Sequence, residues 1–111
     1  MTDLYRQSEI LDHLYHVIDS RRMADPQTSH TARLRKKGRK KIAQKVGEEA
    51  IEVVIASLAE NRTAVVRESV DLFYYLLLLW SECGVLPSTV WTEMQDRFGK
   101  AGMDRHKERL V

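Results

Sequence analysis

Five carboxylates with helical spacing are the residues of this sequence best suited to chemistry. Glu48, Glu49 and Glu52 form one group, and Glu68 and Asp71 form a second. At about 100° per residue, the first group covers an arc of roughly 100° of a helix and the second an arc of about 60°. If two antiparallel helices carry the groups, Glu49-x-x-Glu52 can face Glu68-x-x-Asp71.

A facing group of carboxylates is suited to holding a hard divalent cation. Glu52 and Asp71 lie inside the apolar runs AIEVVIA and SVDLFYYLLLL, where a solvated face is a weaker explanation than it is for Glu48 and Glu49. Desolvation would raise the pKa values of such a cluster unless a cation compensates. Mg²⁺ prefers oxygen ligands and is often shared with substrate phosphates, and it can activate water and neutralise a leaving pyrophosphate. No Glu is followed three residues later by His, so a di-iron site is not expected.

A basic block precedes the carboxylates. Residues 30–47 hold eight basic and no acidic side chains, whereas residues 48–82 hold two basic and seven acidic ones. This arrangement suits an anionic ligand bound together with a metal, with Arg33, Lys37, Lys41 and Lys45 as phosphate-binding candidates. Lys45 shares the arc of the first carboxylate group. A solvated helix is the plainer explanation, and a nucleic-acid patch would normally interleave aromatic residues, of which 31–45 contain none.

Helical periodicity dominates the elements that must position these residues. The apolar spacing predicts helices at about 8–22, 42–60, 64–83 and 87–98, with 23–32 as a loop. Ser8 is the expected N-cap of the first helix, and Gly84 the expected end of the third. With no strand pattern, the fold class is all-α, and the segment 60–63 should turn two central helices into an antiparallel hairpin.

The run LFYYLLLLW (72–80) is apolar around the whole helix and therefore needs cover on all sides. We expect a helical bundle completed by a second subunit. The alternative is that the N- and C-terminal helices of the same chain cover this run. The whole chain, 1–111, should form one domain with a core at about 8–98 and a polar tail at 99–111.

Composition limits the class of protein. The 111 residues carry a net charge of only +2, with 43% hydrophobic and 31% charged residues, which is typical of globular proteins. No apolar run reaches the roughly 18 residues that span a bilayer, so no membrane association is expected. The N-terminus has no signal-peptide pattern, and a single cysteine fits a reducing compartment. These features predict a cytoplasmic protein.

The segments SHTARLRKKGRKKIAQKVGEEAIEVVIA (29–56) and ESVDLFYYLLLL (68–79) resemble the phosphoribosyl-ATP pyrophosphohydrolase family of histidine biosynthesis, among the MazG-like all-α NTP pyrophosphohydrolases. The resemblance implies Mg²⁺-dependent hydrolysis of phosphoribosyl-ATP to phosphoribosyl-AMP and pyrophosphate. It also implies a dimer or larger homo-oligomer with sites near the subunit interface. The metal ligands it implies are Glu49, Glu52, Glu68 and Asp71. The catalytic candidates are Glu48, Glu49 and Glu52, and the substrate-binding candidates are Thr31, Arg33, Lys37, Lys41, Lys45 and Tyr75.

The chain departs from the family pattern at two positions. The family often has Tyr where this chain has His30, and often His where it has Tyr75. No fused cyclohydrolase domain is present, so we expect the stand-alone form. One alternative is a house-cleaning (d)NTP pyrophosphohydrolase of the same superfamily. Another is a non-catalytic helical dimer whose basic block binds nucleic acid or a partner.

Overall fold

The computed structural model describes residues 6–99, and all regular structure within them is helical. A short 3₁₀ turn, Gln7–Glu9, leads into five α-helices. These are α1 (Ile10–Ser20), α2 (His30–Lys37), α3 (Arg39–Ala59), α4 (Arg62–Cys83) and α5 (Pro87–Phe98). The predicted all-α class is confirmed.

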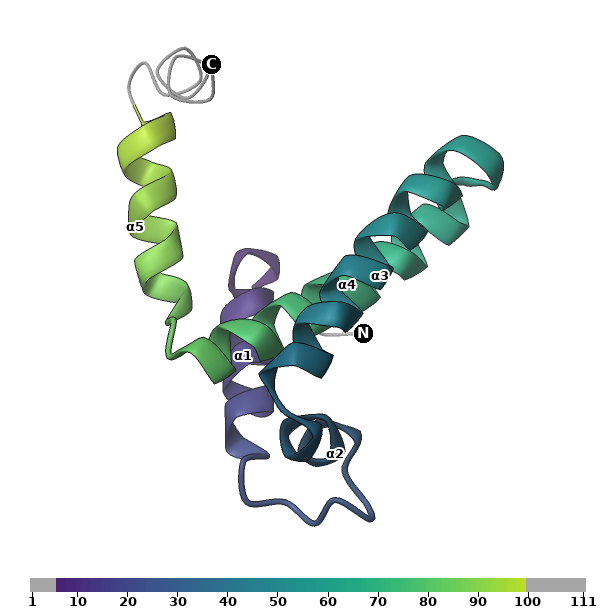
Figure 1. Ribbon diagram of the computed structural model, residues 1–111. Coiled ribbons are helices and arrows are strands. Elements are labelled where there is room, and N and C mark those ends of the chain that lie inside the picture. The colour runs from purple at the N-terminus through teal and green to yellow at the C-terminus, as the bar shows by residue number, and fades with distance from the viewer. Residues whose placement is uncertain (1–5, 100–111) are drawn as a thin grey trace.

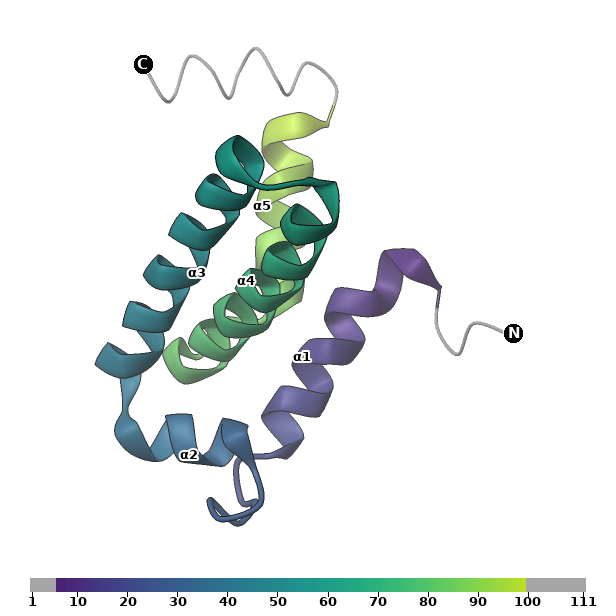
Figure 2. The same ribbon diagram turned by 90° about the vertical axis from the view of Figure 1, so that its right-hand side faces the viewer.

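The two longest helices, α3 and α4, form the central antiparallel hairpin that the sequence predicts (Figures 1 and 2). Two residues, Glu60 and Asn61, connect them. The Asn61 side-chain oxygen accepts a hydrogen bond of 2.9 Å from the backbone N–H of Ala64, so it caps α4. The hairpin therefore reverses over only two residues, so the end of α3 and the start of α4 lie side by side.

The predicted end of α4 is confirmed at Gly84. This residue has φ 72°, in the left-handed region, and its N–H donates to the carbonyls of Ser81 and Trp80. Pro87 then starts α5, which is bent by 107° from α4. Among the described residues, no helix on its own combines the length and apolarity that crossing a membrane requires; α4 and α5 meet that test only as a bent pair.

The core lies on the second half of α4. Ile18, Leu34, Ile42, Leu77 and Leu78 are buried together, and α1 packs along α4 beside them. Burying a side chain of this kind contributes about 2 kcal/mol. The apolar run of α4 is therefore covered partly within one chain, by α1 and α2. In contrast, α5 touches the body mainly at its start, where the Trp91 indole donates to Asp12 at 2.8 Å (Figure 1).

The structure corrects the prediction for residues 23–37. The predicted loop ends at Ser29, whose hydroxyl accepts from the N–H of Ala32 and caps the separate helix α2. Gly38 ends α2 with φ 101°, a conformation that favours glycine. Helix α3 then begins at Arg39, before the predicted start at 42. The basic block is thus divided between two helices that meet at Gly38.

The predicted N-cap at Ser8 is wrong. Ser8 lies inside the 3₁₀ turn, and α1 begins at Ile10 behind Glu9, whose side chain makes no capping bond. The described helices span the predicted core, whereas residues 100–111 of the predicted tail lie outside the described residues.

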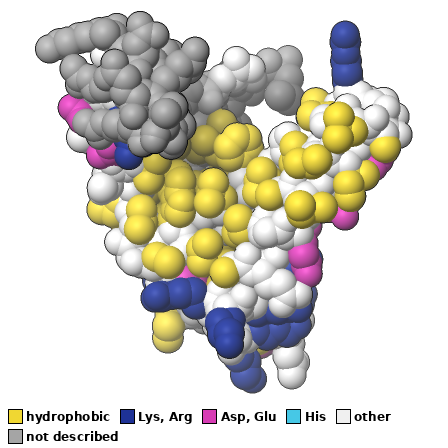
Figure 3. Space-filling view, turned by 45° about the horizontal axis from the view of Figure 1, so that its top comes forward, with side chains coloured by type: hydrophobic (Ala, Val, Ile, Leu, Met, Phe, Trp, Pro, Cys, Tyr) yellow, Lys and Arg dark blue, Asp and Glu magenta, His cyan; other side chains and the backbone are white. Residues whose placement is uncertain are grey.

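A strip of large apolar side chains remains exposed on the hairpin. Figure 3 shows hydrophobic side chains spread along the arm formed by α3 and α4. We call this strip the hairpin apolar face. Its members are Ile51, Val54, Ile55, Leu58, Val66, Val70 and Phe73. Exposed apolar surface of this extent usually marks an interaction site.

Candidate active site

Three of the predicted metal ligands come together on the hairpin. Glu49 of α3 meets Glu68 and Asp71 of α4, and one carboxylate oxygen from each lies within 4.8 Å of the others. Glu68 and Asp71 are three residues apart and share a face of α4. Because the helices run antiparallel, that face lies opposite Glu49.

The charges in this cluster repel one another. Partial burial raises the pKa of Glu49, and the carboxylates of Asp71, Glu68 and Glu52 raise it further, while Lys45 acts in the opposite direction. A group of acidic oxygens at this separation is stabilised by a divalent cation, and an all-oxygen set suits Mg²⁺ better than a transition metal. The residues present therefore fit the predicted ion.

Glu52 lies beside the cluster and not within it. It follows Glu49 by one helical turn, and its charge contributes to the raised pKa of Glu49, but it is not one of the three residues with ligand atoms within 4.8 Å. The sequence also suggested that Glu52 and Asp71 avoid solvent, and both are exposed in the chain. An apolar neighbourhood in sequence did not bury them, because much of that neighbourhood is the exposed hairpin apolar face.

Glu48 is directed toward its own helix. Its carboxylate accepts a hydrogen bond of 2.7 Å from the Gln44 amide and lies 3.5 Å from the Lys45 ammonium. The Gln44 hydrogen bond, followed by Lys45, holds its pKa below the usual range. Glu48 is therefore an ionised, exposed carboxylate on the flank of the cluster.

Lys45 connects the carboxylates to an aromatic group on α4. Its ammonium lies 5.2 Å from the centre of the Tyr75 ring, in cation–π range. Partial burial acts to lower the pKa of Lys45, but Tyr75, Glu48 and Glu49 outweigh burial and raise it. Lys45 is therefore protonated at neutral pH, and its charge lies between the carboxylates and the tyrosine rings of the site.

Helix α2 supplies the other side of the aromatic group. Its first residue, His30, places Nε2 3.3 Å from the Tyr75 hydroxyl. The next residue, Thr31, is buried and shares a hydrogen bond between its hydroxyl and that of Tyr74. The Tyr74 and Tyr75 rings meet edge to face with centroids 5.0 Å apart. The N-terminus of α2 is thus fixed on α4 next to Lys45.

The two departures from the family pattern are partners in one contact. His30 and Tyr75 lie 45 positions apart in sequence and meet in the structure. The pair keeps one imidazole and one phenol, with the positions exchanged. Burial lowers the pKa of His30, and the charges of Arg33, Lys45 and Lys37 lower it further, so the imidazole is predominantly neutral at neutral pH.

The remaining basic candidates surround the site less closely. The Arg33 guanidinium donates to the backbone carbonyls of Pro26 at 2.8 Å and Gln27 at 3.5 Å, so it holds the loop before α2. Lys37 acts electrostatically on His30, and Lys41 on Glu48. Of the four basic candidates, Lys45 is the one with direct contacts to the carboxylate and aromatic side chains of the site.

Sequence reasoning missed Tyr74 and the partnership of His30. The adjacent tyrosines of the run LFYYLLLLW could have indicated these contacts, because a partly buried tyrosine hydroxyl usually finds a hydrogen-bond partner. The partners could not be identified without α2, whose first residues, including His30 and Thr31, fell within the predicted loop.

Comparison with known proteins gives a consistent result. The family described as phosphoribosyl-ATP pyrophosphohydrolase matches residues 11–98. A phosphoribosyl-ATP pyrophosphatase of Paramagnetospirillum magneticum is 51% identical over 104 residues, covering 94% of this chain and 95% of that protein. One of Rhodospirillum rubrum is 52% identical over 101 residues, covering 91% and 86%. One of Gluconobacter oxydans is 45% identical over 109 residues, covering 95% and 82%.

Proposed function

Since the chain belongs to the phosphoribosyl-ATP pyrophosphohydrolase family, we propose that it hydrolyses phosphoribosyl-ATP between the α and β phosphates, giving phosphoribosyl-AMP and pyrophosphate. This is the second step of histidine biosynthesis. The observation that carries the proposal is the meeting of Glu49, Glu68 and Asp71 beside the basic and aromatic group of Lys45 and Tyr75.

Glu49, Glu68 and Asp71 would hold Mg²⁺, with Glu52 as a further ligand one turn away. When bound, the ion supplies a Lewis acid that polarises phosphate oxygens and lowers the pKa of water. The carboxylates themselves bring the ion's charge to a defined place between two rigid helices. That placement matters because phosphoryl chemistry depends mainly on positioning and on charge stabilisation.

Other residues of the chain would bind the substrate and move its protons. Lys45 offers a permanent charge to a phosphate oxygen next to the carboxylates. His30 and Tyr75 present an imidazole and a phenol that can hydrogen-bond to the substrate's polar groups. Glu48 and Glu52 are exposed carboxylates beside the cluster, and either could accept the proton of the attacking water.

The substrate assay that tests this proposal measures pyrophosphate release from phosphoribosyl-ATP and from a panel of (d)NTPs, with and without Mg²⁺. We expect Mg²⁺-dependent release with a clear preference for phosphoribosyl-ATP. Asp71→Asn and Glu52→Gln should lower the rate, whereas Glu60→Gln, at the exposed end of the hairpin, should not. A preference for a dNTP would replace the proposal with the house-cleaning activity. Salt-sensitive nucleic-acid binding without hydrolysis would instead support the hypothesis of a non-catalytic dimer that binds nucleic acid through its basic block.

We also propose that the working form is a homodimer or larger assembly in the cytoplasm. The hairpin apolar face supports association, because seven large apolar side chains exposed along one arm are unfavourable in water. A second copy of the chain carries the same apolar strip and is therefore complementary in character.

A further inference from the structure

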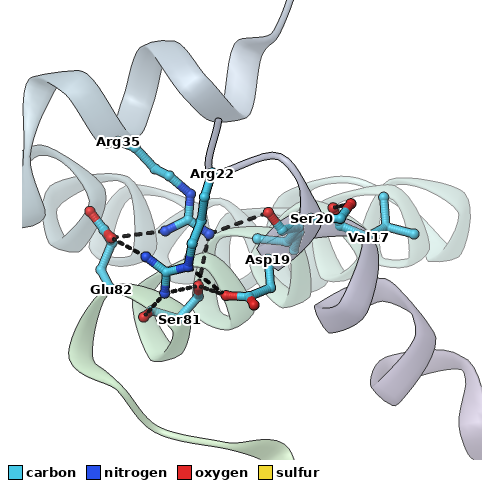
Figure 4. A network of polar contacts seen from close by, with 8 residues as sticks. Val17, Asp19, Ser20, Arg22, Arg35, Ser81 and Glu82 are labelled. Carbon is cyan, nitrogen blue, oxygen red and sulfur yellow. Dashed lines mark hydrogen bonds and ion pairs between the residues drawn. The ribbon is translucent and has the colours of Figure 1, made fainter. Parts of the chain in front are cut away.

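A polar cluster lies at the far end of α4 from the hairpin turn (Figure 4). The Ser81 hydroxyl stands at its centre. It accepts hydrogen bonds from Arg35 at 2.7 Å and from Arg22 at 3.1 Å, and it donates to Asp19 at 2.9 Å. Arg35 also makes an ion pair of 2.8 Å with Glu82. Two arginines and two carboxylates therefore balance around one buried hydroxyl.

The same arginines satisfy the ends of two helices. Arg22 donates to the backbone carbonyl of Ser81 at 2.9 Å, and Arg35 to that of Ile18 at 3.3 Å. These carbonyls belong to the last turns of α4 and α1, where each also accepts a capping backbone N–H, from Gly84 and from Arg21 respectively. Cations are also favourable at the negative end of the helix dipole. The cluster thus joins α1, α2 and α4.

Arg35 is the buried member of the pair of arginines. Its side chain is 9% exposed, compared with 47% for Arg22. Its Nε is buried and bonds to no group among the described residues, whereas its two terminal nitrogens donate to Glu82, Ser81 and the Ile18 carbonyl. Removing one side of a buried ion pair is costly because the other charge remains desolvated. The Arg35 side chain is therefore strongly fixed against Ser81 and Glu82.

This contact fixes α2 at a second point on α4. Near its N-terminus α2 is bonded through Thr31 to Tyr74, and one turn later it is bonded through Arg35 to Ser81. Positions 74 and 81 are two turns apart on α4, roughly 10 Å. Two contacts at this separation set the direction of α2, whereas Thr31 alone would leave it able to pivot about the left-handed backbone of Gly38.

We propose that Arg35 is a positioning residue of the active site, which holds α2 so that His30 reaches Tyr75. The proposal rests on the proposed function for its kinetic consequence. Arg35 touches none of the three carboxylates, which come from α3 and α4. Its removal should therefore weaken substrate binding more than it slows the chemical step.

The test compares Arg35→Met with Arg22→Met. Both substitutions remove a guanidinium from the same Ser81 hydroxyl, but only Arg35 lies on α2. For Arg35→Met we expect KM for phosphoribosyl-ATP to rise about tenfold, with kcat changed by less than about threefold, because misplacement of a binding group by about 1 Å has effects of this size or larger. Arg22→Met should lower Tm and leave KM within about twofold.

Hydrogen exchange of the α2 amides gives a readout that does not depend on activity. Exchange in residues 30–37 should be faster in Arg35→Met than in Arg22→Met, while the centres of α3 and α4 stay equally protected in both. If the wild-type protein hydrolyses no phosphoribosyl-ATP, the proposed function fails, and the exchange comparison still decides the role of Arg35.

Two results would overturn the proposal. One is equal KM and equal α2 exchange in the two variants; the other is a fall in Tm for Arg35→Met with no change in either quantity. If Arg35→Met does not fold, Arg35→Lys takes its place, because a lysine keeps the charge but cannot reproduce the forked contacts to Ser81 and Glu82. Arg35→Lys should then show the same pattern with smaller changes.

Discussion

The ammonium of Lys45 lies 5.2 Å from the centre of the Tyr75 ring, and this contact joins the basic segment of the chain to the acidic hairpin. Lys45 also lies 3.5 Å from Glu48, and its charge opposes the raised pKa of Glu49. A chain with a net charge of only +2 thus concentrates opposite charges at one place. The small total reflects a segregated arrangement of charges, and not a lack of them.

Lys45→Met should lower kcat/KM for phosphoribosyl-ATP by about 100-fold, because removal of one charged stabilising group from an active site commonly costs this much. Steady-state kinetics measure the change. Lys40→Met is the matched control, since Lys40 is an exposed lysine of the same segment. Equal losses in both variants would show that only the general charge of the segment matters.

Asp71→Asn should stabilise the metal-free protein slightly and abolish its response to Mg²⁺. Like charges at helical spacing cost a few tenths of a kcal/mol per pair, and ligand binding to the native state raises Tm. Thermal unfolding with and without Mg²⁺ checks both effects. The wild type should gain stability with the ion, and so should Glu60→Gln. A Mg²⁺ response retained by Asp71→Asn would contradict the assignment of this carboxylate.

The stability of the protein should fall as the pH drops from about 6.5 into the range of the lowered pKa of His30. In that window the unfolded chain binds a proton that the folded chain does not, so the free energy of unfolding decreases with falling pH. His30→Gln should remove this part of the pH dependence. Denaturant unfolding at several pH values measures it, and an NMR titration of His30 above its usual pKa would contradict the expectation.

Leu58→Glu should dissociate the proposed oligomer. Leu58 is 83% exposed on the hairpin apolar face, so a charge there costs the isolated chain little but would be desolvated in an interface. Light scattering during gel filtration measures the mass. Met23→Glu is the control, because Met23 is 95% exposed in the loop before α2. An unchanged mass for Leu58→Glu would exclude this part of the hairpin from the interface.

Two glycine substitutions should change stability in opposite directions. A Cβ at Gly38 or at Gly47 would meet nothing within 4 Å. Gly38→Ala should nevertheless destabilise the protein by about 1–2 kcal/mol, since φ is 101° there. Gly47→Ala, inside α3, should stabilise it by roughly 1 kcal/mol because alanine favours the helix. Denaturant unfolding measures the change in the free energy of unfolding for each variant. A change of the same sign in both variants would contradict the argument from backbone conformation.

The hairpin and its carboxylates could be predicted because both depend on local spacing. Glu68 and Asp71 share a face by helical geometry alone, and a polar turn between two apolar helices brings that face opposite Glu49. The end of α4 at Gly84 follows from the same kind of local rule.

The contacts of α2 could not be predicted, because they depend on a change of direction at a single residue. The basic segment reads as one continuous helix entry until Gly38 takes a positive φ. The solvent exposure of individual side chains on the hairpin could not be predicted from the sequence either. Glu52 lies among apolar neighbours, and yet both it and several of those neighbours are exposed in the chain.

The short connection between α3 and α4 has a consequence for how the site assembles during folding. Contact between Glu49 and Glu68 closes a loop that runs only from position 49 to position 68, whereas His30 and Tyr75 are 45 positions apart. Closing the longer loop costs about 0.8 kcal/mol more chain entropy, and it also requires α2 to dock. We therefore expect the carboxylate cluster to form early, with the hairpin, and the histidine–tyrosine contact to form late.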